Sequence, residues 1–334
     1  MKNKMAALLA ACMVFSLCVT GCGSAADTAA EPETPAEETS GQTPKEEPAK
    51  EEEPAEEAEE KPSEESGDQS ADTAILAVSF GTSFNESRDI TIGAIENAIS
   101  EAFPQYPVRR AFTAQIIIDK LAERDGIQID NVTQALDRAV ADGIKNLIVQ
   151  PTHLMNGLEY ADLVDELADY ETDFDQIVLG EPLLTSDEDY EAVIKAITDA
   201  TKSYDDGETA IVFMGHGTEA ESNQVYAAMQ EKLSAAGFGN YYIGTVEANP
   251  SLEDVVAALK EAGTYKKVVL EPLMVVCGDH ANNDMAGDEE DSWKTAFEAE
   301  GYEVECVLRG LGEMEGIRKI YVDHTQAAID SLAD

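Results

Sequence analysis

Between residues 74 and 308, short apolar runs alternate with longer amphipathic stretches. The runs are rich in Val, Ile and Leu, which is typical of parallel strands buried on both faces. The predicted strands are Ala74–Phe80, Val108–Phe112, Asn146–Gln150, Gln176–Leu179, Ala210–Met214, Tyr241–Val246, Lys267–Leu273 and Glu303–Leu308. The predicted helices include Glu86–Ala102, Asn131–Ala141, Leu158–Ala168, Glu188–Lys202, Glu221–Ala235 and Leu252–Ala262. This alternation predicts an α/β fold.

The two halves of this region resemble each other. AILAVSFGTS from residue 74 corresponds to AIVFMGHGTE from residue 210, and NLIVQPTHLMNG from residue 146 corresponds to KVVLEPLMVVCGDH from residue 267. We therefore expect two similar lobes, residues 72–203 and 204–334, each with a four-stranded parallel sheet flanked by helices. In such sheets ligands bind beyond the carboxyl ends of the strands, so the lobes are predicted to enclose a cleft there.

The first 21 residues have a different pattern, that of an export signal. Lys2 and Lys4 precede an apolar run, Met5 to Val19, which is short for a membrane span. The run leads into Thr20-Gly21-Cys22, so Cys22 is the expected lipidation site of a bacterial lipoprotein. The alternative is an ordinary signal peptide with an incidental cysteine. The prediction is an exported, membrane-anchored protein on the periplasmic or cell-surface side.

Residues 22–71 are rich in Glu, Pro, Ala, Ser and Thr and contain no aromatic residue. Such a segment cannot bury enough apolar surface to offset the entropy lost on ordering. We expect a disordered acidic tether, so that the lipid anchor is the only membrane contact.

The charge balance excludes some classes of partner. The chain has 68 acidic and 22 basic residues and a net charge of −46 at pH 7, whereas nucleic-acid binding requires clustered Lys and Arg. Its glycine turns match neither a Walker loop nor a GxGxxG fingerprint, so no nucleotide cofactor is expected. The acidity favours solubility, or alternatively an acidic surface that attracts cations.

Three of the four histidines follow predicted strands directly: His153, His216 and His280. His324 falls in the last predicted helix and is expected to be a surface or packing residue. Neutral imidazole binds Co, Ni, Fe and Zn, and it exchanges protons near neutral pH. Glu181 also follows a strand and could complete a site of nitrogen and oxygen ligands. The positions indicate a metal site at the strand ends.

Several motifs together resemble one known family. They are AVSFGTS with Glu86 and Arg88, then QPTHLMNGLEY, GEPLL, FMGHGTE and PLMVVCGDHANNDMAGDEEDSWK, and they cover about residues 74 to 325. This combination is similar to the anaerobic cobalt chelatases, the sirohydrochlorin cobaltochelatases of the class II chelatase group.

The resemblance implies a metal chelatase, a lyase that inserts Co²⁺ into a sirohydrochlorin-type tetrapyrrole without ATP, on the route to cobalamin. Co²⁺ is then a substrate, with Fe²⁺ as a further candidate metal. The family's metal-binding and catalytic histidines correspond to His153 and His216, and its glutamate ligand to Glu181. Arg88 and His280 are expected on the substrate side.

The predicted export signal keeps an alternative open. An exported member of such a family could instead bind a tetrapyrrole, haem or a metal for uptake. A homo-oligomer is also left open by the sequence.

Overall fold

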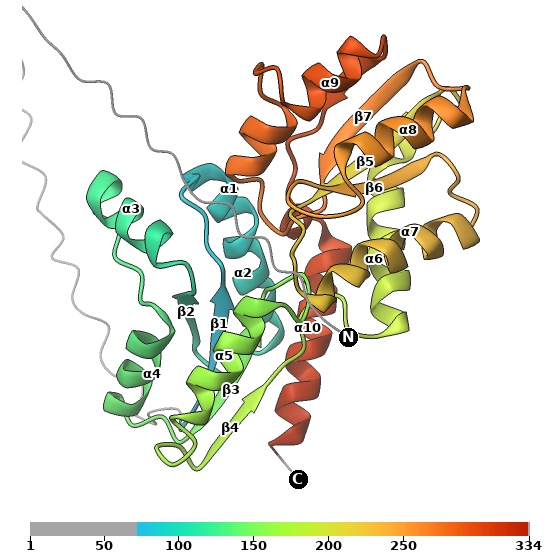
Figure 1. Ribbon diagram of the computed structural model, residues 1–334. Coiled ribbons are helices and arrows are strands. Elements are labelled where there is room, and N and C mark those ends of the chain that lie inside the picture. Colours follow the sequence, from blue (N-terminus) through green and yellow to red (C-terminus); the bar gives the residue numbers. More distant parts are fainter. Residues whose placement is uncertain (1–71, 333–334) are drawn as a thin grey trace, which may run out of the picture. The chain divides into compact units, whose positions relative to one another are not determined.

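The computed structural model describes residues 72–332, and these residues contain two parallel four-stranded sheets with the same strand order (Figure 1). The first sheet has the order β2-β1-β3-β4, and the second has the order β6-β5-β7-β8. The strands are β1 Thr73–Ser79, β2 Val108–Phe112, β3 Asn146–Pro151, β4 Gln176–Leu179, β5 Thr209–Gly215, β6 Tyr241–Thr245, β7 Lys267–Pro272 and β8 Glu303–Cys306. The predicted α/β fold with two similar sheets is confirmed.

Ten α-helices flank these sheets within residues 72–332. They are α1 Asn85–Ile90, α2 Ile92–Ala102, α3 Gln115–Asp125, α4 Val132–Ala141, α5 Leu158–Ala168, α6 Asp187–Thr201, α7 Gln224–Ala235, α8 Leu252–Ala262, α9 Trp293–Ala299 and α10 Glu315–Ser331. Asn131, Ser186 and Ser251 begin three of them with reciprocal capping boxes. The single predicted helix Glu86–Ala102 is divided at Thr91, which has φ −113° and ψ −79° and whose N–H and hydroxyl both donate to the Ser87 carbonyl.

Each sheet has one face with a core of its own, and the two remaining faces share a core. The first sheet packs against α4 and α5, and the second against α8 and α9. The shared core combines Ile75 and Ile148 of the first sheet with Ile211 and Phe213 of the second. Because this core is continuous, the two sheets form one packed body.

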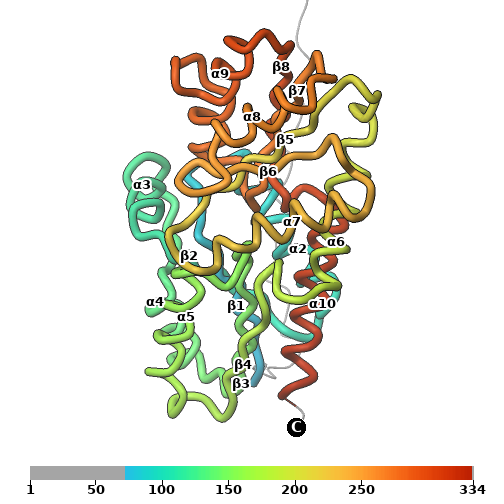
Figure 2. Tube along the Cα trace, turned by 45° about the vertical axis from the view of Figure 1, so that its right-hand side comes forward, coloured from blue at the N-terminus to red at the C-terminus, as the bar shows by residue number. Residues whose placement is uncertain are grey.

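Two helices of this shared core pack against elements of the other half of the chain (Figures 1 and 2). Helix α6 follows β4 of the first sheet but packs against α7, whereas α10 follows β8 of the second sheet but packs against β3 and α2. The predicted boundary at residues 203 and 204 separates the two sheets, and α10 returns to the first sheet from beyond it.

Loops at the carboxyl ends of the two sets of strands meet. The Cys277 N–H, beyond β7, donates to Ser87 Oγ in α1 at 3.0 Å. A methyl group placed on Gly278 would lie 3.4 Å from Thr82 Oγ1, beyond β1. A methyl group placed on Gly157, beyond β3, would lie 3.7 Å from Ser222 Oγ, beyond β5. The strand ends of both sheets therefore border a common region.

A buried ion pair supports the second sheet. Glu271 of β7 is completely buried, and its carboxylate accepts from Arg309 Nε at 2.7 Å and Nη2 at 3.0 Å. Burial raises the pKa of Glu271, while Arg309 opposes that shift. Removal of the arginine would leave a buried carboxylate without a charged partner.

We expect Arg309→Met to lower the free energy of unfolding by about 3 kcal/mol, measured by urea denaturation. The double variant Glu271→Gln/Arg309→Met should recover most of this loss, because its buried carboxylate is gone. If the double variant is as unstable as the single variant, the uncompensated charge is not the cause.

Candidate functional site

Two histidines and one glutamate converge beyond the second sheet. One ligand atom from each of His216, Glu247 and His280 lies within 4.8 Å of the other two. The imidazole centroids of the two histidines are 4.7 Å apart, with the rings nearly perpendicular. Two imidazoles and a carboxylate are a donor set that suits divalent transition metals.

Glycines on both sides of His216 set its backbone path. Gly217 has φ +87°, and a methyl group there would lie 2.8 Å from the Ala248 backbone nitrogen. A methyl group on Gly215 would overlap the ring of Tyr226. A side chain at either position would thus disturb the turn that presents His216, or displace the neighbouring loop that carries Glu247.

Hydrogen bonds orient both imidazoles of this group. His216 Nδ1 lies 2.8 Å from the Gly217 carbonyl oxygen, and His280 Nδ1 lies 2.6 Å from Asp284 Oδ2. Both partners are acceptors, so Nδ1 is the donor in each bond, and in the neutral ring Nε2 is the nitrogen left to bind a metal ion. In metal sites, a hydrogen bond of this kind to one ring nitrogen fixes the orientation of the imidazole whose other nitrogen binds the ion.

Glu247 was not predicted as a site residue. Its backbone N–H donates to the His216 carbonyl at 2.9 Å, and Asn223 Nδ2 donates to the Asn249 carbonyl at 2.7 Å, which ties its loop to the segment beyond β5. The available signal was its place directly after the predicted strand Tyr241–Val246. One glutamate among so many acidic residues did not stand out as the rare histidines did.

His153 differs from the other strand-end histidines because it is buried. It follows β3, and neither ring nitrogen has a hydrogen-bond partner among the described residues. Burial lowers the pKa of His153 to about 4. The ring is therefore neutral at neutral pH, and its lone pair can bind a metal ion or accept a proton from a bound molecule.

Helix α10 holds the backbone around His153 and Glu181. The Tyr321 hydroxyl lies within donating distance of two carbonyl oxygens, that of Thr152 at 3.0 Å and that of His153 at 3.2 Å. His324 Nδ1 lies 3.1 Å from the Glu181 carbonyl oxygen, which also accepts from Gln150 Nε2 at 3.0 Å. The two loops lie side by side, since the Leu183 N–H donates to the His153 carbonyl. His324 is therefore an anchor for a loop of the candidate site.

The structure distributes the other predicted residues over different places. His153 and Glu181 follow strands of the first sheet and do not belong to the group of His216, Glu247 and His280. Arg88 is almost fully buried in α1, with Nη1 donating to Asn85 Oδ1 at 2.8 Å. The predicted signal peptide, the predicted lipidation site Cys22 and the predicted tether lie outside the described residues. Among residues 72–332, no helix is both long and apolar enough to cross a membrane.

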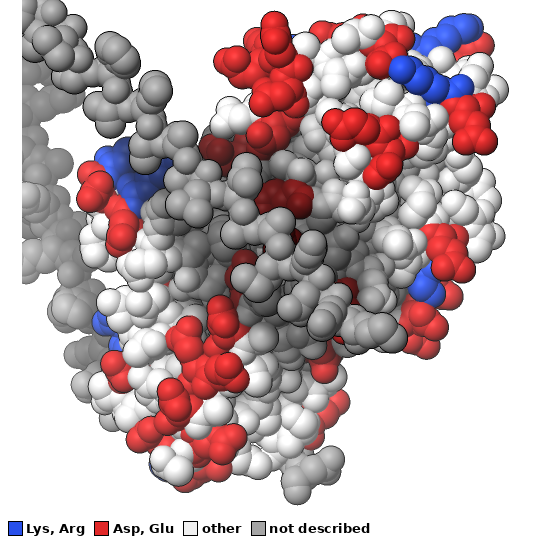
Figure 3. Space-filling view, in the orientation of Figure 1, with Lys and Arg blue, Asp and Glu red and all other residues white. Residues whose placement is uncertain are grey.

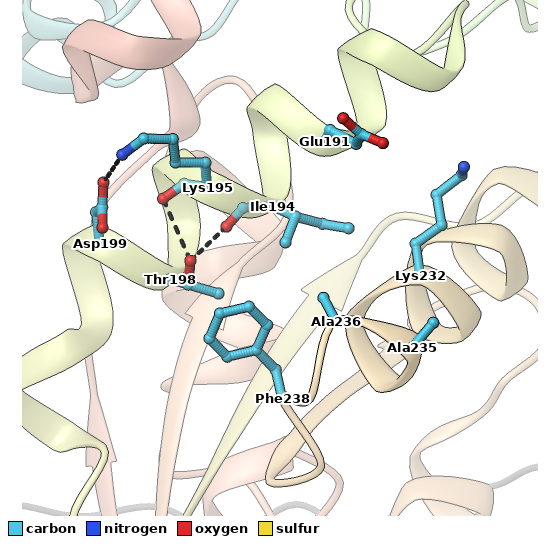
Figure 4. Close-up of a pocket in the computed structure, with 9 residues that line it drawn as sticks. All are labelled: Glu191, Ile194, Lys195, Thr198, Asp199, Lys232, Ala235, Ala236 and Phe238. Atoms are coloured by element: carbon cyan, nitrogen blue, oxygen red, sulfur yellow. Dashed lines mark hydrogen bonds and ion pairs between the residues drawn. The ribbon is translucent and has the colours of Figure 1, made fainter.

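A pocket between α6 and α7 is lined by none of these residues (Figure 4). It has a volume of about 570 Å³, and its lining includes Ile194, Lys232 and Phe238 but none of the candidate ligands. Acidic side chains are spread over the face shown in Figure 3 and basic ones are few. This surface agrees with the large excess of acidic residues in the sequence.

The burial of His153 predicts an acid-sensitive fold. The ordinary histidine pKa is 6.5, and in the folded protein it is about 4, so between these values the unfolded chain binds the proton more readily. Stability from this group is complete above pH 6.5 and is lost as the pH falls towards 4, by up to about 3 kcal/mol.

Urea denaturation from pH 7 to 4, with a chelator present, measures this effect. We expect His153→Leu to lose less stability on acidification than the unsubstituted protein. Identical pH profiles for the two proteins would contradict the assignment of this acid sensitivity to His153.

Comparison with known proteins identifies the family. The family model for cobalt chelatase (CbiK) matches residues 73–330. The chain is 38% identical over 260 residues to a sirohydrochlorin cobaltochelatase of Salmonella typhimurium, a match covering 78% of this chain and 97% of that protein. It is 34% identical over 262 residues to sirohydrochlorin cobaltochelatase CbiKC of Nitratidesulfovibrio vulgaris, covering 78% and 92%.

Solved structures share the fold at much lower sequence identity. SirB from Bacillus subtilis with Fe³⁺ superimposes with a TM-score of 0.55 at 14% identity, covering 78% of this chain and 98% of SirB. With the family match over residues 73–330, these comparisons show that the chain belongs to the CbiK cobalt chelatase family.

Proposed function

We propose that this protein is a sirohydrochlorin cobaltochelatase, a lyase that inserts Co²⁺ into a sirohydrochlorin-type tetrapyrrole for cobalamin biosynthesis without a nucleotide. The observation that carries the proposal is the set of strand-end histidines inside a chain that matches the cobalt chelatase family over residues 73–330. Fe²⁺ is the second candidate metal, because imidazole and carboxylate accept several divalent ions.

The reaction requires two pyrrole N–H protons to leave while the ion exchanges its water for ring nitrogens. His216 presents an Nε2 lone pair that can hold the ion. His153 is neutral and lacks a hydrogen-bond partner within the described part, so it is suited to accept a proton or bind the metal. In this proposal His153, Glu181 and His216 are the metal ligands, as the resemblance to the family implies.

Two residues are proposed to contact the substrate, one following a strand of the second sheet and one in α1. His280 lies beside His216 and would face the tetrapyrrole. Arg88 is proposed to bind a substrate carboxylate, which would replace Asn85 or Asp89 as a partner of its guanidinium. Burial of Arg88 strengthens such a charge-assisted bond.

We propose further that the protein is exported and anchored through a lipid on Cys22, in which case its activity lies outside the cytoplasm. The support is the sequence pattern of residues 1–22. This location favours one second candidate function, the capture of a tetrapyrrole, haem or metal for uptake. A tetrapyrrole that copurifies with a protein lacking turnover would support uptake, whereas catalytic turnover supports the chelatase.

Anaerobic incubation of the purified protein with sirohydrochlorin and Co²⁺, followed by absorbance, tests the activity. We expect insertion faster than the uncatalysed rate, and we expect His153→Ala and His216→Ala each to slow it by about 100-fold or more. Glu219→Gln, an exposed carboxylate three residues beyond His216, is the control. The absence of acceleration refutes the function, and full turnover in both histidine variants refutes the site.

Removal of the Tyr321 hydroxyl tests whether α10 positions His153. We expect Tyr321→Phe to lower turnover by about tenfold, with a smaller effect on KM, because the reacting group shifts while the remaining contacts persist. Tyr241→Phe is a matched control, since the buried Tyr241 hydroxyl lies 2.9 Å from Thr201 Oγ1. Equal turnover losses in the two variants would indicate a general effect on stability.

A further inference from the structure

We infer that His216, Glu247 and His280 form a resting site, which holds a divalent transition-metal ion before the tetrapyrrole binds and requires neither His153 nor Glu181. The inference deepens the proposed function and rests on it, because a chelatase must hold an ion that it later releases. Glu247 thereby gains a role that neither the sequence pattern nor the resemblance to the family assigns to it.

The strand order of the second sheet builds this resting site. Strands β6, β5 and β7 are neighbours, with β5 in the centre and all three parallel. Glu247 follows β6, His216 follows β5 and His280 follows β7, so the three residues lie in a row along one sheet edge. All three ligands therefore come from one sheet, whereas the predicted set His153, Glu181 and His216 draws on both.

The spacing of the three donors is close to that of a bound ion. Ligand atoms at about 2.0–2.2 Å from one metal ion are separated by roughly 3–4 Å, and the donor atoms here lie within 4.8 Å of one another. Glu247 is exposed and its side chain is long, so a rotation of its carboxylate can make the remaining approach. The backbone of its loop is meanwhile held by the His216 carbonyl.

The histidines distinguish this group from an ordinary cluster of surface acids. Each Nδ1 is engaged by an acceptor, the Gly217 carbonyl for His216 and Asp284 for His280, so both free lone pairs are on Nε2. The Asp284–His280 pair is a carboxylate–histidine arrangement that makes the imidazole a stronger ligand. These two independent contacts prepare two rings 4.7 Å apart for a common cation.

The exposure of the three side chains of the resting site suits the uptake of an ion from solvent. His216 and Glu247 are exposed and His280 is partly buried, so an ion can reach them from solvent. Three protein ligands leave coordination positions for water or for incoming ring nitrogens. His216 belongs to both ligand sets, and it would let an ion pass from the resting site to the tetrapyrrole without release.

Titration of the full-length, metal-free protein with Co²⁺ alone tests the resting site, with visible absorption and calorimetry as readouts. We expect Glu247→Gln and His280→Gln to raise the Kd for Co²⁺ more than about tenfold, and Asp284→Asn to raise it roughly 10–100-fold. His153→Ala and Glu181→Gln should raise the Kd much less than Glu247→Gln does, because both residues lie outside the resting site. Glu219→Gln is the control for a general loss of negative charge, and circular dichroism verifies the fold of each variant.

Two results would overturn the inference: an unchanged Kd in folded Glu247→Gln, or an equal loss of affinity in Glu181→Gln. The insertion assay separates this inference from the proposed function. If Co²⁺ affinity depends on Glu247 but no cobalt enters sirohydrochlorin, the resting site stands and the chelatase proposal fails. If insertion proceeds while Glu247→Gln binds Co²⁺ normally, the chelatase stands and the resting site is wrong.

Discussion

A parallel sheet brings the carboxyl ends of all its strands to one edge, and here a continuous core holds two such sheets with their strand-end loops in contact. Every candidate ligand follows a strand at one of these edges. The constraint is geometric, because parallel strands require crossover helices that cover the faces and leave only the edges for polar loops. Functional side chains distant in the sequence are thus neighbours through strand order alone.

The shared core also makes the two halves depend on each other. Helix α10 is the last helix of the second half, yet its Tyr321 and His324 hold the backbone of loops that follow β3 and β4. A displacement of α10 would therefore move the loops of both His153 and Glu181. In this way the packing of one half determines the geometry of candidate ligands in the other.

Much of the fold follows from the sequence because the inner strands β1, β3, β5 and β7 are nearly continuous apolar runs. The predicted strands coincide with the observed ones to within two residues at their ends. The break at Thr91 had no such signal in the sequence. His216 and His280 were recognisable because histidine is rare in this chain. Glu247 was not recognisable, because it is close to the histidines only through the β6-β5-β7 strand order, which the sequence does not reveal. The anchoring role of His324 likewise depends on the return of α10 to the first sheet.

The contrast between the two environments of histidine separates binding from proton transfer. His153 is buried and its pKa is low, so its protonated form is disfavoured unless an anionic group lies beside it. His216 and His280 are accessible and oriented by acceptors, which favours capture of a hydrated cation from solvent. The proposed metallation uses both properties, since the ion arrives from water whereas the pyrrole protons pass to a ring that is neutral at neutral pH. In that proposal, a tetrapyrrole bound between the strand ends would meet the accessible pair on one sheet and the buried ring on the other.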